Sequence, residues 1–387
     1  MAIVYGLLIV VFICSLVITP LVIKFSKKFN LVDIPKDSRR VHIKPMPRVG
    51  GIAIVLSMFI GFAIYYFITK DIPSIALNEK FLGYIIGAFI IFLMGLIDDV
   101  FNLRARYKFV FQLAAGCVIY YFGMRISGIK IPFIYTDLIS FGWLSFPITL
   151  TWIIGVTNAV NLIDGLDGLA AGISAISATA LLTIFIATSA SLEAIIITAV
   201  LVGATLGFLP YNFNPAKTFM GDVGSNFLGF TLAVVSMLGF AKGYTLLAII
   251  APILALGVPI FDTVFAMVRR FLKGQPMLKP DGAHVHHRLI NRGLTQRQAV
   301  LVLYTVTSVL CIIAVVIISA DIWKLILLIL ATVCFVILGY ISMKRTKEHP
   351  EDNQKQVNEN FKMDMVFDQE DNKQHKHNKQ EIDKNLK

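Results

Sequence analysis

The chain has 387 residues, of which 57% are hydrophobic and only 15% are charged, and its mean hydropathy is +0.75. A soluble domain of this length does not need so much apolar surface, so the composition excludes an ordinary soluble protein and indicates a membrane protein. The formal net charge of +11 is assigned first to Lys and Arg in cytoplasmic loops, and we expect no nucleic-acid partner. The four cysteines all lie in apolar runs without metal-type spacing, which predicts free thiols and no disulfides.

Apolar runs long enough to cross a bilayer, which takes about twenty residues, recur along the chain without a convincing internal repeat. They cover residues 2–23, 50–69, 81–97, 109–123, 146–163, 169–188, 194–210, 223–241, 244–267, 298–319 and 322–343. The first run has no basic segment before it and no cleavage signature after it, so it is expected to be retained as a span. The sequence therefore predicts an all-α polytopic membrane protein with about eleven transmembrane helices.

Basic residues are concentrated in alternate loops. The loop after the first span contains Lys24, Lys27, Lys28, Lys36, Arg39, Arg40, Lys44 and Arg48, and every second loop after it is also basic. Because cytoplasmic loops are enriched in Lys and Arg, the N-terminus is predicted to lie outside. With an odd number of spans, the C-terminus is then cytoplasmic.

Two segments outside the spans have their own character. On the outer side, Ile129–Tyr135 and Leu138–Leu144 alternate loosely and favour a short hairpin. After Lys344 the chain becomes rich in charged and amide residues, which cannot bury a core. We expect a membrane domain over residues 1–343 and a disordered cytoplasmic tail over 344–387.

The most distinctive polar stretch is Asn158–Leu169, which reads Asn-Ala-Val-Asn-Leu-Ile-Asp-Gly-Leu-Asp-Gly-Leu at the end of an apolar run. A charged side chain inside a bilayer costs about 2.5–3.5 kcal/mol or more, so carboxylates there indicate a functional site. In a helix its two amides and two carboxylates would recur every three residues on one face. These side chains are Asn158, Asn161, Asp164 and Asp167. The alternative is a polar helix cap, which uses one such residue and not four.

Further polar clusters fall on the same side of the predicted membrane. They are Asp98 and Asp99 at the end of the third span, Asp222 at the start of the eighth, and His284, His286 and His287 between the ninth and tenth. Every cluster is predicted to lie on the cytoplasmic side, although residues at the ends of spans could have been on either side of the membrane.

Carboxylates brought together need a cation or a pKa shift, because two charges 4 Å apart repel by about 4 kcal/mol at an effective dielectric of 20. Hard oxygen ligands favour Mg²⁺, with Mn²⁺ as the second candidate, and Mg²⁺ typically takes one or two carboxylates plus phosphates and waters. The histidine segment has no cysteine nearby and suits phosphate better than zinc. A solvated cytoplasmic connection is the alternative for that segment.

Two weaker signals leave their interpretations open. Arg48, in Pro47-Arg48-Val49-Gly50-Gly51, could lie near an anion or simply be a basic flank of the second span. Asp262, about two helical turns inside the ninth span, could contact substrate or metal, or could pair with a buried partner such as Arg269.

Together these segments resemble the polyprenyl-phosphate N-acetylhexosamine-1-phosphate transferases, over residues 1–343. The matching motifs are Pro47–Gly51, Gly95-Leu96-Ile97-Asp98-Asp99, Asn158–Leu169, Phe219–Ser225 and His284–Leu289. The resemblance implies transfer of a sugar-1-phosphate from a UDP-sugar to a polyprenyl phosphate, with release of UMP. It also implies Mg²⁺ and an active site on the cytoplasmic face of a bacterial plasma membrane.

By the same resemblance, individual residues receive roles. Asp98 is the candidate base for the lipid phosphate, with Asp99 beside it as a catalytic residue and metal ligand, and Asp222 is the principal metal ligand. The substrate-binding residues would be Arg48, Lys108, Asn158, Asn161, Asp164, Asp167, His284, His286, His287 and Arg288. The chain departs from the MraY branch, which has a lysine soon after the acidic pair, where this sequence has Asn102 and Leu103.

The histidine motif, followed by Arg292-Gly293-Leu294-Thr295, resembles the WecA/TagO branch. The expected donor is therefore UDP-GlcNAc and the expected acceptor undecaprenyl phosphate, in teichoic-acid linkage-unit synthesis or another cell-wall glycan pathway. A MurNAc-pentapeptide donor is the alternative. A proton-coupled transporter would place its acids near the midplane on broken helices, often in paired halves, and a receptor or scaffold would not need them. Oligomeric state stays open, with a homodimer as the candidate.

Overall fold

The computed structural model describes residues 1–33, 46–72, 78–131, 135–240, 246–272 and 284–319. The helices are α1 (Ala2–Lys28), α2 (Gly51–Thr69), α3 (Glu79–Phe101), α4 (Ala105–Tyr121), α5 (Ser145–Ile163), α6 (Leu169–Ala187), α7 (Leu192–Asn212), α8 (Gly221–Phe240), α9 (Leu246–Ala255), α10 (Gly257–Leu272), α11 (Val285–Asn291) and α12 (Gln296–Ser319). The predicted span 322–343 and the tail lie outside the described residues. Within the described residues the all-α class is confirmed.

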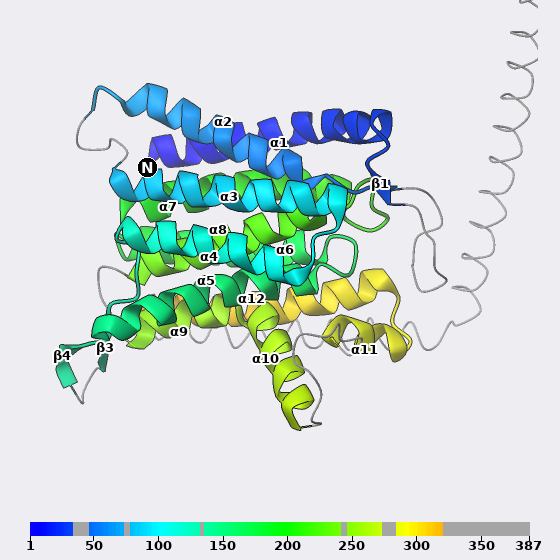
Figure 1. Cartoon of the computed structure of the whole chain (residues 1–387). Coiled ribbons are helices and arrows are strands. Elements are labelled where there is room, and N and C mark those ends of the chain that lie inside the picture. Colours follow the sequence, from blue (N-terminus) through cyan, green and yellow to red (C-terminus); the bar gives the residue numbers. More distant parts are fainter. Residues whose placement is uncertain (34–45, 73–77, 132–134, 241–245, 273–283, 320–387) are drawn as a thin grey trace, which may run out of the picture. The chain divides into compact units, whose positions relative to one another are not determined.

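Most of the long helices run side by side in one bundle, and α10 leaves it at a steep angle (Figure 1). Eight described helical segments are long and apolar enough to cross a membrane: α1, α2, α3, α6, α7, α8, α12 and Gly142–Ile163, which includes α5. Helix α4 covers the predicted span 109–123 but has only 17 residues. The polytopic character is therefore clear, whereas eleven spans and the sidedness of the termini stay predictions.

The predicted single helix over 244–267 is wrong. The chain turns at Leu256, which separates α9 from α10. Pro259 falls in the first turn of α10, where a missing N–H group costs little, so a new helix can begin there but the previous one cannot easily continue. Seven large apolar side chains of α10 are exposed: Phe261, Val264, Phe265, Met267, Val268, Phe271 and Leu272. This helix buries one narrow face instead of spanning within the bundle.

Helix α8 lies at the centre of the bundle, where it packs against α2, α3, α5, α6 and α7. Two glycines allow its first turns to approach other backbones closely. A Cβ added at Gly51 would lie 2.3 Å from the Gly224 nitrogen, and one added at Gly95 would lie 2.5 Å from the Val223 Cα. The start of α8, which carries Asp222, is therefore held tightly between α2 and α3.

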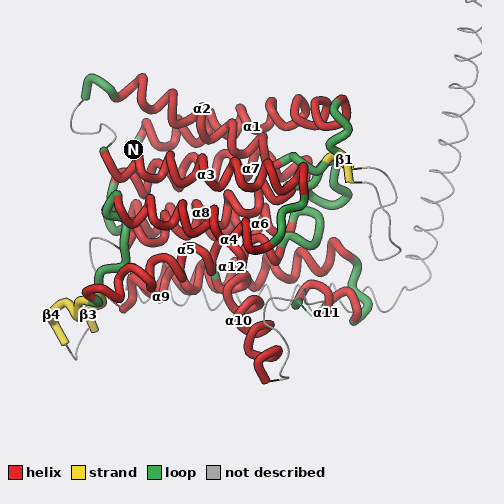
Figure 2. The backbone as a smooth tube through the Cα atoms, viewed as in Figure 1, coloured by secondary structure: helices red, strands yellow, loops and turns green. Residues whose placement is uncertain are grey.

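Two small antiparallel sheets lie at the ends of the bundle (Figure 2). Strands β3 (Gly128–Ile131) and β4 (Tyr135–Ser140) form the predicted outer hairpin, with an irregularity between Ile129 and Ile131, and Gly142–Leu144 is a short 3-10 helix instead of strand. Strands β1 (Val32–Asp33) and β2 (Met46–Pro47) pair Val32 with Pro47. The β1–β2 pair fixes the course of the backbone just before Arg48.

Candidate active site

Lys108 lies between two carboxylates from different helices. It begins the second turn of α4, and its Nζ forms ion pairs with Asp98 Oδ2 at the end of α3 and with Asp222 Oδ1 at the start of α8, the latter at 3.3 Å. The other Asp98 oxygen accepts a hydrogen bond of 2.6 Å from the Leu103 N–H. Asp98 is almost completely buried, whereas the Asp222 side chain keeps 18% of its exposure. Asp222 is therefore the more accessible of the two carboxylates.

Asp99 has a different environment from its neighbour in sequence. Its two oxygens accept hydrogen bonds from the backbone N–H groups of Asp222 and Val223, at 2.9 and 3.1 Å. A carboxylate is favoured there, because the first N–H groups of a helix have no partner within the helix and the dipole attracts negative charge. Asp99 thus caps α8 from another helix and fixes where α8, and with it Asp222, is positioned.

Arg48 reaches the same carboxylates from the segment before α2. Its Nε lies 3.4 Å from Asp99 Oδ1, its Nη2 lies 3.8 Å from Asp222 Oδ2, and its Nη1 donates a 3.1 Å hydrogen bond to Asn102 Oδ1. The backbone around Arg48 is fixed by hydrogen bonds of Phe219 N to Pro47 O and of Gly50 N to Phe219 O. Arg48 therefore lies beside two carboxylates, and its part in substrate binding stays a prediction.

The amides of the Asn158–Leu169 stretch support Asp222. Asn161 Nδ2 donates to Asp222 Oδ1 at 2.8 Å and to Ser225 Oγ at 2.7 Å. Asn158 does not contact the carboxylate directly; it exchanges hydrogen bonds with the buried Gln112, which also donates to Asn226 Oδ1 at 3.3 Å. Asn226 in turn donates to Asp222. A continuous amide network therefore runs beneath the carboxylate.

The two acids of that stretch are separated by their surroundings. Burial, together with the negative charges of Asp222, Asp99 and Asp167, raises the pKa of Asp164 to about 8. Asp167 instead accepts hydrogen bonds from Asn214 Nδ2 and the Ala216 N–H, at 3.1 and 3.2 Å. The four side chains predicted to share one helical face do not do so, because α5 ends at Ile163 and the two acids follow it in a turn.

The histidines lie beside the same stretch. His284 Nδ1 is 2.8 Å from Asp262 Oδ2, and the Val285 N–H donates to the other oxygen of Asp262. Of the roles left open for Asp262, a buried pairing is therefore observed, with His284 as the partner. His286 packs on Gly165, where an added Cβ would lie 2.5 Å from His286 Nε2. His287 and Arg288 are exposed.

Several polar residues of the site were not expected from the sequence. Gln112, Asn226 and Asn214 all hydrogen-bond to predicted site residues. Ser225, which closes the motif Phe219–Ser225 but was given no role, accepts a hydrogen bond from Asn161. One signal was available for Gln112, since it is an isolated amide in the apolar run 109–123 and lies one turn after Lys108. Asn226 directly follows the Phe219–Ser225 motif.

The chemistry of the donor set fits a hard divalent cation. Within the described residues no group of three or more His, Cys, Asp or Glu side chains forms a ready metal cage. Mg²⁺ does not require one, because it usually takes one or two carboxylates and completes its shell with waters and phosphates. The exposed part of Asp222 and the crowded carboxyl group of Asp164 provide such oxygens, and a cation would relieve the repulsion that raises the Asp164 pKa.

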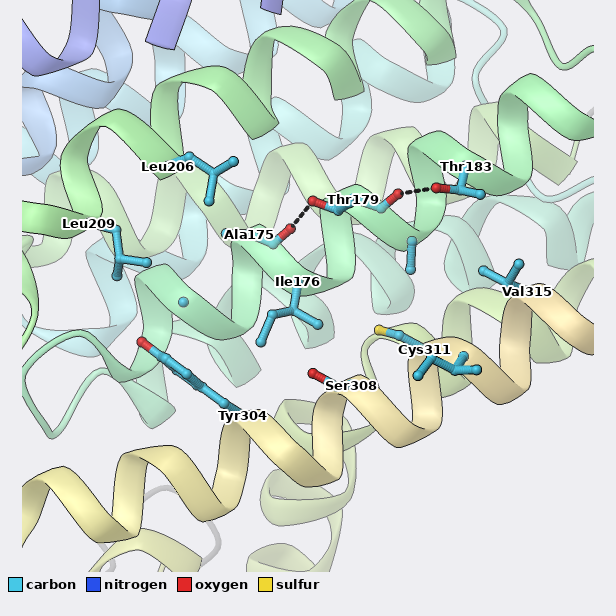
Figure 3. Close-up of a pocket in the computed structure, with 13 residues that line it drawn as sticks. Ala175, Ile176, Thr179, Thr183, Leu206, Leu209, Tyr304, Ser308, Cys311 and Val315 are labelled. Atoms are coloured by element: carbon cyan, nitrogen blue, oxygen red, sulfur yellow. Dashed lines mark hydrogen bonds between the residues drawn. The ribbon is translucent and has the colours of Figure 1, made fainter. Parts of the chain in front are cut away.

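A cavity of about 560 Å³ lies elsewhere, between α6, α7 and α12 (Figure 3). Its lining is apolar and includes none of the acids, so it does not suit a nucleotide or a phosphate. Tyr304 at one end donates a hydrogen bond of 2.5 Å to the Gly168 carbonyl oxygen. The candidate site is therefore the carboxylate cluster and not this cavity.

Comparison with known proteins identifies the group to which this arrangement belongs. Residues 81–240, from α3 to α8, match glycosyl transferase family 4. A protein of Bacillus subtilis, named as a probable undecaprenyl-phosphate N-acetylglucosaminyl 1-phosphate transferase, is 41% identical over 333 residues, which are 85% of this chain and 90% of that protein. The chain belongs to the polyprenyl-phosphate N-acetylhexosamine-1-phosphate transferase family.

Two other relatives have names that differ from that of the Bacillus subtilis protein. A decaprenyl-phosphate N-acetylglucosaminephosphotransferase of Mycolicibacterium smegmatis is 35% identical over 72% of this chain and 73% of its own length. A phospho-N-acetylmuramoyl-pentapeptide-transferase of Halalkalibacterium halodurans is 31% identical over 80% of this chain and 95% of its own length. The family-matched segment of the transferase contains Asp98, Lys108, Asn161 and Asp222, whereas Arg48 and the histidine segment lie outside it.

Proposed function

We propose that the transferase moves GlcNAc-1-phosphate from UDP-GlcNAc to undecaprenyl phosphate on the cytoplasmic face of the membrane and releases UMP. The name of the Bacillus subtilis relative, an undecaprenyl-phosphate N-acetylglucosaminyl 1-phosphate transferase, supports this transferred group and this acceptor. The observation that carries the proposal is the placement of Lys108 and Arg48 among Asp98, Asp99 and Asp222 at one end of the bundle. Alternating charges of this kind suit the binding of phosphate groups and a divalent cation.

In the proposed reaction, an oxygen of the lipid phosphate attacks the β-phosphorus of UDP-GlcNAc. The bond between that phosphorus and the oxygen bridging to the α-phosphate breaks, and UMP leaves with the bridging oxygen. A phosphate monoester has a second pKa of about 6 and is mostly dianionic at neutral pH, so the lipid phosphate needs little deprotonation before it attacks. Positioning and charge neutralisation therefore dominate the catalysis.

The residues divide the work accordingly. Lys108, whose Nζ pairs with Asp98, would bind the acceptor phosphate, and Asp222 with Asp164 would hold Mg²⁺. When bound, Mg²⁺ (or Mn²⁺) supplies neutralisation of the diphosphate charge. His286, His287 and Arg288 provide donors to the same diphosphate. Asp99 acts as a positioning residue through the first turn of α8.

The proposal is tested by giving the purified protein undecaprenyl phosphate, Mg²⁺ and either UDP-GlcNAc or UDP-MurNAc-pentapeptide. UMP is expected with UDP-GlcNAc only, and excess EDTA should abolish its release. Release with UDP-MurNAc-pentapeptide alone would favour the second candidate donor, which the Halalkalibacterium halodurans relative supports. Full turnover in EDTA would contradict the metal assignment.

A further inference from the structure

We propose that Arg48 is a built-in counter-ion that partly neutralises the carboxylate cluster in the free enzyme and binds the donor diphosphate once a divalent cation takes its place. The inference rests on the proposed function and assigns Arg48 a specific part in it. It starts from charge. Three carboxylates, those of Asp98, Asp99 and Asp222, face the two cations of Lys108 and Arg48.

The two cations are held differently. Lys108 Nζ forms ion pairs with Asp98 and Asp222, and the Asp98 carboxylate that orients it is almost fully buried. Arg48 lies 3.4 and 3.8 Å from its two carboxylates, beyond the range of about 2.7–2.9 Å for charge-assisted hydrogen bonds. Its side chain keeps 30% of its exposure, whereas the Asp99 side chain has none. Arg48 is therefore the cation that can change partners.

The position of the Arg48 backbone restricts where the guanidinium can go. Hydrogen bonds tie Pro47 and Gly50 to Phe219, and another ties the Arg48 N–H to Leu31 O. The fixed backbone keeps the guanidinium within reach of Asp222, and its third contact is the Asn102 side chain. Asn102 ends α3 with φ of 50°, a conformation that Asn adopts more readily than most residues.

The exchange follows from electrostatics. A divalent cation on Asp222 repels Arg48 and leaves the cluster with excess positive charge, which favours the two phosphates of the donor. A guanidinium presents five N–H donors in a fork that matches phosphate oxygens, and toward the described residues Arg48 uses one of them in a hydrogen bond, to Asn102. Arg48 would thus weaken metal binding alone and strengthen binding of metal and nucleotide together.

This opposite effect on the two ligands gives a sharp test. Arg48→Gln should bind Mg²⁺ more tightly in the absence of nucleotide, by about tenfold, and UDP in the presence of saturating Mg²⁺ more weakly, by about ten- to a hundredfold. Mg²⁺ binding is followed through the rise in Tm with Mg²⁺ concentration, and UDP binding by calorimetry on the full-length protein. Arg48→Lys, which keeps the charge, should show the Mg²⁺ affinity of the wild type and an intermediate UDP affinity.

Two further variants separate position from charge. Asn102→Gly removes the acceptor and still allows the left-handed conformation, so it should weaken UDP binding severalfold and leave Mg²⁺ affinity unchanged. Arg106→Gln removes a nearby exposed arginine that contacts Tyr107, and should change neither affinity.

A joint weakening of Mg²⁺ and UDP binding in Arg48→Gln would overturn the inference, because it would mean that Arg48 only supports the fold. Unchanged UDP binding would overturn it too. If these affinities shift as expected while the wild type releases no UMP, Arg48 keeps its role and the proposed transfer reaction fails instead.

Discussion

Adjacent acids in this transferase do different work because a helix points them apart. Neighbouring side chains on a helix diverge by about 100°, and here Asp98 turns to Lys108 while Asp99 turns to the start of α8. Asp98 and Asp99 were both expected to act in catalysis. The geometry favours a role for Asp98 in orienting Lys108 toward a ligand, and a supporting role for Asp99 at the start of α8.

Replacing Asp99 with asparagine should therefore affect stability as well as activity. An amide can accept with its oxygen only, so one of the two capping hydrogen bonds is lost, at a cost of about 1–2 kcal/mol. Thermal unfolding in detergent should show a lower Tm for Asp99→Asn, together with reduced UMP release. An unchanged Tm with lost activity in Asp99→Asn would mean that Asp99 contacts a ligand.

The amide network below Asp222 should behave as a unit. Gln112 is 1% exposed and contacts Asn158 and Asn226, so Gln112→Leu leaves buried partners unpaired, at about 1–3 kcal/mol each. Combined with Asn158→Leu, the second substitution should cost less than it does alone. A double-mutant cycle on unfolding free energy measures this coupling, expected at about 1 kcal/mol. Additive losses would show that the two amides act independently.

These residue-level partners were the hardest part of the site to predict. Carboxylates in an apolar chain are conspicuous on their own, which is why Asp98, Asp164 and Asp222 could be singled out from the sequence. Gln112 becomes part of the site only through contacts with residues 46 and 114 positions away. A single sequence contains no local signal for such pairings.

At the scale of elements, the approach of α8 to its neighbours depends on two glycines. Gly51→Ala and Gly95→Ala each place a Cβ within 2.5 Å of the α8 backbone, and neither backbone can yield cheaply. Both variants should lower the Tm and reduce UMP release, with a loss of about 1–3 kcal/mol for such overpacking. Gly155→Ala is the matched control, since nothing lies within 4 Å of its added Cβ. Wild-type Tm and activity in Gly51→Ala would contradict the described packing.

Helix α11 should detach in mild acid. Burial, with the neighbouring His287 and His284, lowers the pKa of His286 to about 4 from its usual 6.5. Between these values the undocked histidine binds more protons than the docked one, so docking is fully stable above pH 6.5 and weakens as pH falls toward 4. Hydrogen-exchange protection of residues 285–291, corrected for intrinsic rates, should fall over this range. His286→Gln should remove the pH dependence; its persistence would assign the effect to another group.

Element boundaries were predictable where they depended on local sequence. Apolar length alone located α1 to α8 and α12, and the hairpin β3–β4 followed from alternation. The break between α9 and α10 was missed, although Gly257 and Pro259 mark it. A continuous apolar run looks the same whether it forms one helix or two. By contrast, α5 ends at Ile163 and α6 begins at Leu169, as the predicted span ends have it, although the acids between them lie in a turn and not on a helical face.

At the scale of the whole molecule, the orientation in the membrane is a prediction from loop charge. In a background without the four native cysteines, Ser140→Cys and Arg292→Cys each place one exposed thiol near opposite ends of the described bundle. A membrane-impermeant maleimide should label Ser140→Cys on intact cells and Arg292→Cys only after permeabilisation. The reverse pattern would place the acid cluster outside and remove its access to a cytoplasmic nucleotide.

The central claim is that the carboxylate cluster transfers a phosphosugar and not a sugar alone. UDP-GlcNAc labelled with ³²P at the β-phosphate and with ³H in the sugar distinguishes the two, when incubated with the purified protein, Mg²⁺ and undecaprenyl phosphate. We predict that both labels enter the lipid in equal amounts while unlabelled UMP is released, and that Asp222→Asn, which loses the proposed metal ligand, does neither. Transfer of ³H to the lipid with ³²P retained in released UDP would contradict the account.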